Sequence, residues 1–159
     1  MPNDPNDDLI ERLGDPEPEV RARSIAELER LTRTSPELAE AAHREILQLA
    51  DGTEFWLIRM NVCRMSPLVE WTPEEYERIL AFLFAEVERN EGFVTAWALD
   101  ALARLAAKDE SIRSRVLYLL EEVEATGSPA VRARSRKAAK VLRQTLFESG
   151  YGPAPGSGT

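Results

Sequence analysis

The residue types best suited to catalysis in this sequence are a single histidine and a single cysteine. His43 stands two positions before Glu45, and an imidazole beside a carboxylate can bind a metal or transfer a proton. Cys63 stands between Arg59 and Arg64, whose positive charges favour the reactive thiolate of a nearby thiol. One histidine excludes a cluster of histidine ligands, and one cysteine excludes an internal disulfide or a multi-thiolate site. We therefore expect no catalytic residue, no metal and no cofactor.

A period of 37 residues places both side chains in an array of helices. Val94 begins an amphipathic helix, and the equivalent residues in the other copies are Val20, Leu57 and Val131. We call these four residues the anchors. Positions five, eight and eleven after the anchors, and eleven before them, hold almost only apolar residues: Ile25, Val62, Leu99 and Arg136; Leu28, Met65, Leu102 and Ala139; Leu31, Leu68, Leu105 and Leu142; Leu9, Ile46, Leu83 and Leu120. Arg136 departs from the pattern in the last copy, where a terminal repeat lacks one neighbour.

The register assigns a structural role to the histidine and the cysteine. His43 shares its position with two leucines of later copies, so we expect it to lean onto the core. Cys63 shares its position with Asp100 and Lys137, so we expect a surface cysteine that faces away from the core.

Turn and cap signals divide the chain into helix pairs. We expect one helix between Pro36 and Gly52, an early helix end at Ser66-Pro67, and a capping box that begins at Thr72. The expected organisation is a flexible N-terminus over residues 1–6, a repeat domain over residues 7–148 and a flexible Gly/Pro tail over residues 149–159. Its repeats span about residues 7–34, 36–70, 73–107 and 109–147.

Four helix pairs at constant spacing bury their apolar faces only by stacking, which predicts a right-handed α-solenoid. The second helices add a more specific likeness. Residues 15–28 contain an Asp-Pro turn followed by Val20 and Arg21, and residues 128–135 repeat the pattern with Val131 and Arg132. This pattern resembles the signature of HEAT repeats, an armadillo-like class. The resemblance implies an all-α solenoid of about four HEAT-like pairs, whose second helices line a concave face, and assigns Arg21 and Arg132 to the fold's own polar contacts.

Composition limits the classes of partner. The net charge is −8, which disfavours a general binder of nucleic acid or of anionic membranes. The N-terminal residues are polar and acidic, without the basic start and apolar run of a signal peptide, and no apolar stretch reaches bilayer length. We therefore expect an acidic cytoplasmic protein with no membrane contact.

The position three after each anchor points away from the expected core direction. It holds Arg23, Met60, Trp97 and Arg134, with Arg30, Arg59 and Arg104 beside it. Tryptophan, methionine and arginine without a core role are typical of interface hot spots. We therefore expect a non-catalytic interaction module, a scaffold or adaptor, that binds a protein or peptide with acidic and apolar groups. In the alternative interpretation, Trp97 and Met60 pack on each other and shield the repeat junction.

Two other functions follow from the resemblance. HEAT-like DNA glycosylases for alkylated bases use a basic concave face, aromatic residues and a carboxylate, and Trp97, Asp100 and Arg104 loosely imitate this set. HEAT-like accessory subunits of pigment lyases are the second alternative. The last helix is basic, with Arg132, Arg134, Arg136, Lys137, Lys140 and Arg143 before its first acid, Glu148. This cluster is either a binding patch or the solvated end of the array.

Overall fold

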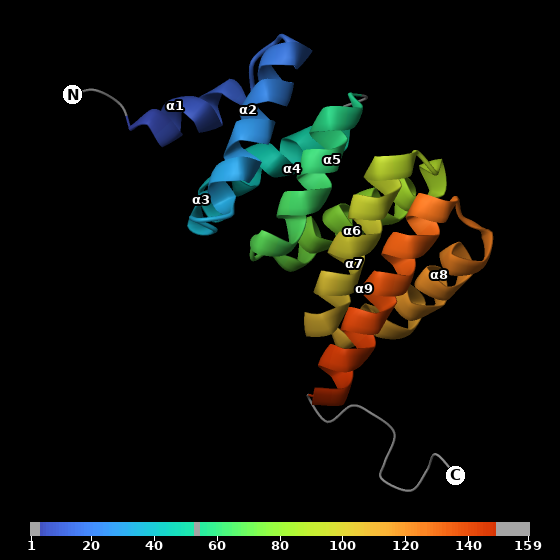
Figure 1. The fold of residues 1–159 in the computed structure, drawn as a ribbon. Helices are drawn as coiled ribbons and strands as arrows, with labels where there is room; N and C mark the ends of the chain where they lie inside the picture. The colour runs from blue at the N-terminus through green and yellow to red at the C-terminus, as the bar shows by residue number, and fades with distance from the viewer. Residues whose placement is uncertain (1–3, 53–54, 149–159) are drawn as a thin grey trace, which may run out of the picture. The chain divides into compact units, whose positions relative to one another are not determined.

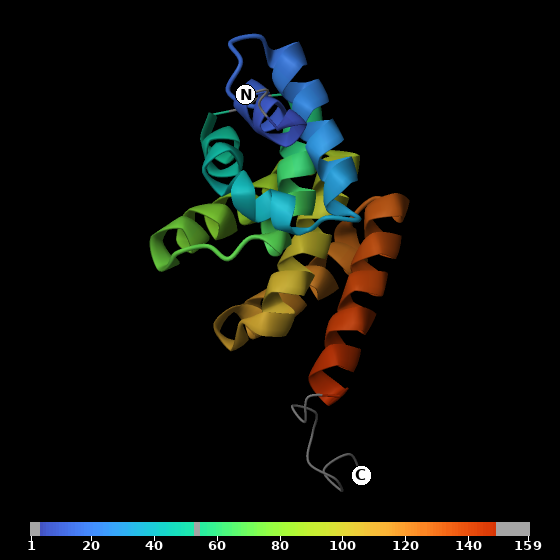
Figure 2. The ribbon, with the colours of Figure 1, turned by 90° about the vertical axis from the view of Figure 1, so that its left-hand side faces the viewer.

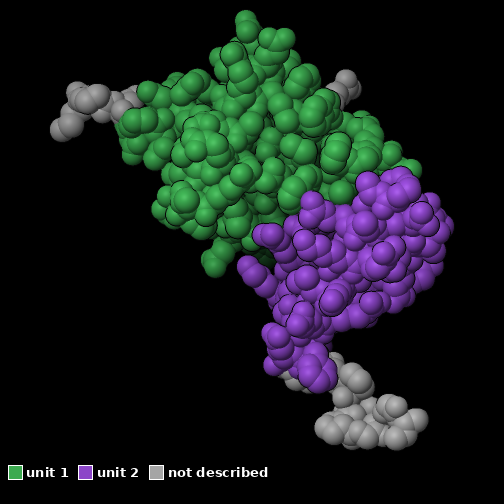
Figure 3. Space-filling view, in the orientation of Figure 1, with its two compact units in different colours: residues 1–98 green, residues 99–159 purple. Residues whose placement is uncertain are grey.

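The computed structural model describes residues 4–52 and 55–148, and the regular structure there is entirely helical (Figure 1). The all-α class predicted from the sequence is confirmed for these residues. The chain divides into two compact units, residues 1–98 and 99–159, which Figure 3 colours separately. Residues 1–3 and the expected tail over residues 149–159 lie outside the described part, so the flexibility expected for these residues stays a prediction.

Unit 1 contains the helices α1 to α6 and the first turns of α7. They are α1 (Pro5–Arg12), α2 (Pro18–Thr32), α3 (Glu37–Ala41), α4 (His43–Gly52), α5 (Trp56–Met65), the 3-10 turn η1 (Ser66–Leu68), α6 (Pro73–Arg89) and the start of α7 (Gly92–Lys108). Helix α2 packs against α1, α3 and α5, while α4 packs against α5 and α6. Consecutive second helices of the predicted pairs, α2 and α5, are therefore direct neighbours.

Unit 2 contains the rest of α7, the 3-10 turn η2 (Glu110–Ile112), α8 (Arg113–Thr126) and α9 (Pro129–Glu148). Helices α8 and α9 pack against each other, and the Ser135 hydroxyl donates to the Leu120 carbonyl at 2.6 Å. Arg113 closes the end of α7, because Nε and Nη2 donate to the carbonyls of Ala106 and Ala107 at 2.8 and 3.1 Å. These bonds satisfy carbonyls that a helix end leaves open.

Several helix ends follow the local sequence signals. Thr72 and Glu75 form the expected capping box of α6, and α5 passes into η1 at Ser66-Pro67. Helix α6 ends at Arg89, and its C-cap residue Asn90 has a φ of 54°, in the left-handed region that asparagine tolerates well.

Two helix boundaries differ from the expectation. Helix α1 begins at Pro5, within the segment expected to be loose, because the Asp4 carboxylate accepts the backbone N–H of Asn6 at 2.9 Å. The expected single helix over residues 36–52 is two helices, α3 and α4, which Figure 2 shows with a break between them. His43 Nδ1 lies 3.0 Å from the Glu40 carbonyl at this break, so the imidazole helps to end α3.

The core follows the 37-residue register. Leu83, Leu102 and Leu105 are buried as predicted, and so are all four residues eleven positions before the anchors. One stripe of the second helices is buried in α7 and exposed in α9. The buried residues are Ala96, Leu99, Ala103 and Ala106, and their exposed counterparts are Ala133, Arg136, Lys140 and Arg143. Exposure of this stripe in the last copy is what a terminal repeat predicts.

Candidate interaction surface

Arg59 does not lie on the surface where the sequence pattern placed it. Its side chain is buried, with 3% of the residue exposed, so it is not accessible to a binding partner. The residues two positions after the anchors in neighbouring copies, Ala22 and Ala96, are buried as well. The position therefore belongs to the interior of the helix array, and the charge of Arg59 was a misleading guide to exposure.

Arg59 forms a buried ionic cluster instead. Its Nη1 lies 2.7 Å from Oε2 of Glu86, and its Nη2 lies 2.6 Å from Oε2 of Glu91. Glu86 is also buried, whereas Glu91 is partly open to water. The hydrogen bond from Arg59 holds the pKa of Glu91 below its ordinary value. The cluster joins α5 to α6 and to the residue that precedes α7.

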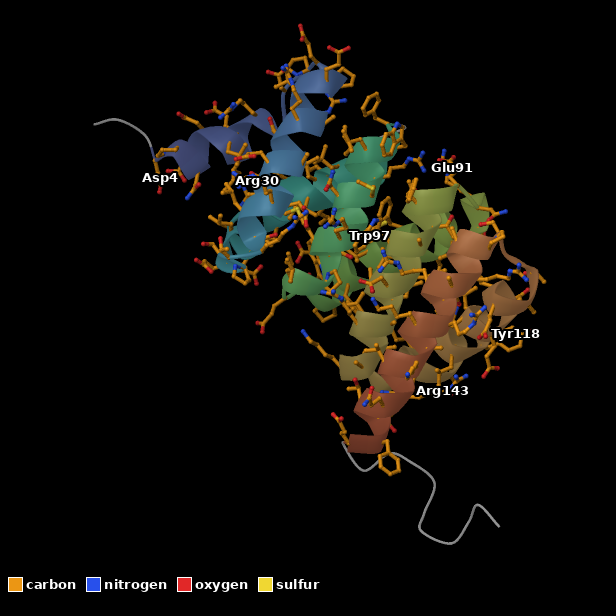
Figure 4. All side chains as sticks on the ribbon, viewed as in Figure 1. Asp4, Arg30, Glu91, Trp97, Tyr118 and Arg143 are labelled. Carbon is orange, nitrogen blue, oxygen red and sulfur yellow. The ribbon has the colours of Figure 1, made fainter. Side chains whose placement is uncertain are left out.

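Trp97, which Figure 4 labels, is half-buried on α7. An arginine of α5 packs against its ring. The guanidinium carbon of Arg64 is 4.2 Å from the centroid of the Trp97 ring, a cation–π contact. Arg64 Nη2 also pairs with Oε1 of Glu29 on α2 at 3.0 Å. A continuous set of contacts therefore runs from α2 through α5 to α7, and Arg64 covers part of the Trp97 ring.

The remaining candidate residues of unit 1 retain exposure to solvent. Arg23 and Arg30 are exposed on α2, and Met60 on α5 is half-buried. Arg30 pairs with Glu27, three residues earlier on the same helix, at 2.6 Å. Unit 1 thus places Arg23, Met60 and Trp97 on its three second helices.

Arg104 and Arg134 belong to unit 2, whereas Arg23, Met60 and Trp97 belong to unit 1. Arg104 is exposed, and its Nε lies 3.1 Å from Oδ2 of Asp100 on the preceding turn. The carboxylate that loosely resembles a glycosylase base is therefore held by an arginine of its own helix. Arg134 is half-buried on α9.

The expectation of a surface cysteine is wrong. Cys63 is fully buried in unit 1, and burial raises the pKa of its thiol far above the ordinary value. A thiol without water and with a raised pKa is a poor nucleophile, although Arg59 and Arg64 stand nearby in the sequence. His43 is half-buried, as are the two leucines at its position in later copies.

Two exposed aromatic residues were missed by the sequence interpretation. Trp56 is 50% exposed and Phe93 is 76% exposed, and each stands one position before an anchor. The bond from Arg59 to Glu91 brings the N-terminal ends of α5 and α7 next to each other. The position before the anchor holds Glu19 and Ala130 in the other copies. The signal in the sequence was therefore that this position is aromatic only in the two middle copies, which is not expected of a position in the shared core.

Comparison with known proteins supports the fold class. The crystal structure of an engineered protein from the Northeast Structural Genomics Consortium superimposes with a TM-score of 0.65 at 13% sequence identity. The match covers 94% of this chain and 71% of the engineered one, and identity this low indicates likeness of fold alone. No protein-family model and no curated protein matches the sequence. The fold and the comparison together define an all-α protein, and none of its described helices is long and apolar enough to cross a membrane.

Proposed function

We propose that this chain is a non-catalytic protein-interaction module built as a HEAT-like α-solenoid. The proposal is supported by the agreement between the 37-residue register and the buried positions, and by the packing of α2 on α5. Arg21 adds support, because its Nη1 donates to the carbonyls of Asp15 and Pro16 at 2.5 and 3.0 Å. These bonds hold the Asp-Pro turn within the first copy, so Arg21 has a structural role, while the contacts between repeats that the HEAT signature implies stay a prediction.

The observation that carries the proposed function is the exposure of Trp56 and Phe93 at equivalent positions of neighbouring helices. Large aromatic side chains that gather on a surface are typical of sites that bind another protein. Met60 and Trp97 lie further along the same two helices, α5 and α7. The proposed site is formed by Trp56 and Phe93 with the exposed parts of Met60 and Trp97, and Arg23 holds the equivalent position on α2.

The charge of the site favours a partner with acidic and apolar groups. Arg23 supplies an exposed positive charge on α2, although the whole chain is acidic, whereas the charge of Arg64 beside Trp97 is already paired with Glu29. Aromatic residues, methionine and arginine are enriched in interface cores relative to lysine and the acids. A peptide or protein with carboxylates next to apolar side chains therefore fits this face best.

The test is an affinity capture from extract of the native cell, compared between the wild type and a Trp56→Ala/Phe93→Ala variant. We expect the wild type to retain a defined partner and the double variant to lose it, because truncation of hot-spot aromatics typically weakens binding by about 2 kcal/mol or more. Trp97→Ala is a second variant with the same expectation. Circular dichroism checks that each variant keeps its helical content.

The matched control is Tyr118→Ala, which removes another exposed aromatic side chain, in unit 2. Retention of the partner by this control and its loss from the double variant would support the proposed face. Equal capture by all variants would place the site elsewhere and contradict the proposal.

A further inference from the structure

Within the part of the chain that the structure describes, one side of α2 lacks the covering helix that the same side of α5 has. In α5 this side faces the preceding second helix, since Arg64 pairs with Glu29 of α2. The stripe consists of the anchor and the positions three, seven and eleven after it. These residues are Leu57, Met60, Arg64 and Leu68 in α5, all half-buried, and Val20, Arg23, Glu27 and Leu31 in α2. Spacing of this kind lies along one face of a helix, and in α5 that face receives a helix.

In α2 the uncovered stripe forms one wall of a groove of about 500 Å³, and α1 forms the other wall. The apolar lining comes from Leu9, which is buried, and from Val20 and Leu31, which are half-buried. Arg12 of α1 and Arg23 of α2 line the same groove and are exposed. The groove therefore combines an apolar base with two guanidinium groups.

The acidic side chain in the groove has an ion-pair partner, whereas the two arginines that line the groove do not have one among the described residues. Glu27 also lines it, but Arg30 holds both Glu27 carboxylate oxygens, at 2.6 and 3.0 Å. Arg12 donates through Nε to the backbone carbonyl of Asp8, and it pairs with no carboxylate of the described residues. Among the described residues, Arg23 makes neither an ion pair nor a side-chain hydrogen bond. The groove thus has an excess of positive charge in a chain of net charge −8.

We propose that the groove between α1 and α2 binds an acidic amphipathic helix of a partner protein, in the place that a preceding second helix would occupy. This inference deepens the proposed function and rests on it, because it names the partner chemistry that Arg23 recognises. Carboxylates of the partner helix pair with Arg23 and Arg12, and its apolar side chains cover Val20 and Leu31. Recognition of an amphipathic helix in an apolar groove is a recurrent mode of peptide binding.

A second copy of the chain does not fit the same groove through its exposed C-terminal helix. The outer face of α9 presents Arg136, Lys137 and Lys140, all exposed. Like charges placed against Arg12 and Arg23 repel and suppress this pairing. The chemistry of the groove therefore favours an acidic partner over head-to-tail stacking of identical chains.

The test uses two fluorescein-labelled synthetic helices and fluorescence anisotropy with the full chain. One helix has leucines along one face and aspartates beside them, and the other has lysines in place of the aspartates. We expect the acidic helix to bind and the basic one not to bind. Arg23→Glu should raise the dissociation constant of the acidic helix by at least about tenfold, which corresponds to roughly 1.4 kcal/mol of binding free energy.

Arg44→Glu is the matched control, because Arg44 is exposed on α4 and its replacement makes the same change in net charge. It should bind the acidic helix within about twofold of the wild type. Equal binding of the two synthetic helices, equal losses for Arg23→Glu and Arg44→Glu, or no binding of the acidic helix would each overturn the inference.

The Trp56→Ala/Phe93→Ala variant separates this inference from the proposed function. We expect it to bind the acidic synthetic helix like the wild type, since neither residue lines the groove. Failure of the capture experiment with an intact groove would count against the aromatic site alone. If the Trp56→Ala/Phe93→Ala variant fails to bind the acidic helix while Arg23→Glu still binds it, the inference that the groove is the binding site is overturned.

Discussion

Arg59 joins three segments of unit 1 through one guanidinium. Its Nη atoms reach Glu86 on α6 and Glu91 just before α7, while its own helix is α5. Arg59 and Glu86 are both almost completely buried, so each compensates a charge that water no longer solvates. Removal of one partner is therefore more damaging than removal of both.

We predict that Arg59→Met lowers the free energy of unfolding by about 3 kcal/mol, because it leaves the buried Glu86 carboxylate with only the guanidinium of Arg89, 3.8 Å away. The double variant Arg59→Met/Glu86→Leu should recover most of this loss. Urea denaturation followed by circular dichroism measures both variants against the wild type. A double variant as unstable as Arg59→Met would show that the guanidinium stabilises the fold through its packing.

The same cluster predicts a dependence of stability on pH. The hydrogen bond from Arg59 lowers the pKa of Glu91 in the folded chain from its ordinary value of 4.5. The stabilisation is therefore fully present above pH 4.5 and is lost as the pH falls through the lowered pKa. We expect the difference in unfolding free energy between wild type and Glu91→Gln to narrow over that range. A difference that stays constant with pH would contradict this assignment.

At the scale of the helices, local sequence signals predicted the ends of helices better than they predicted which side chains are buried. Thr72 and Ser66-Pro67 affect only the backbone of residues close to them in the sequence. The capping box and the end of α5 could therefore be predicted from the sequence. The burial of Arg59 and Cys63 depends on helices far along the chain, and a polar or isolated side chain gives no sign of that cover. The exposed Trp56 and Phe93 were missed for the converse reason, since aromatic residues usually indicate a core.

Helix α7 depends on its apolar stripe. Leu102 is completely buried, and we predict that Leu102→Ala lowers the free energy of unfolding by about 2–5 kcal/mol through lost burial and a residual cavity. Val141→Ala on the exposed side of α9 is the control and should change stability by less than about 0.5 kcal/mol. Chemical denaturation measures both. A loss below about half a kcal/mol for Leu102→Ala would mean that the position tolerates a cavity and does not define the core.

At the scale of the whole molecule, acidic and basic side chains are unevenly distributed. The chain has 28 acids and 20 lysines and arginines, yet α9 has six basic residues before its first acid. On α9, Arg136 and Arg143 pair with Glu124 and Glu121 of α8 at 3.1 and 2.8 Å. These pairs reduce the excess positive charge of unit 2.

We predict that the chain does not bind duplex DNA tightly even at about 50 mM salt, because phosphate-dominated binding needs an extended excess of cations. A gel-shift assay at increasing salt concentration measures this. Tight binding that weakens steeply with salt would favour the glycosylase-like alternative, in which Trp97, Asp100 and Arg104 have a role.

The buried cluster around Arg59 also bears on how such a chain can evolve by duplication and recombination. Glu86 stands eight positions before its anchor, and the same position holds Arg12, Leu49 and Val123 in the other copies. An exchange of whole copies preserves the 37-residue register and, for the first copy, a glutamate at the position of Glu91, yet it would replace Glu86, the buried partner of Arg59, by a cation or a hydrocarbon. The order of the second and third copies is thus encoded in one ionic contact. Crossovers that separate these two copies should be purged by selection, whereas crossovers that keep them together are tolerated.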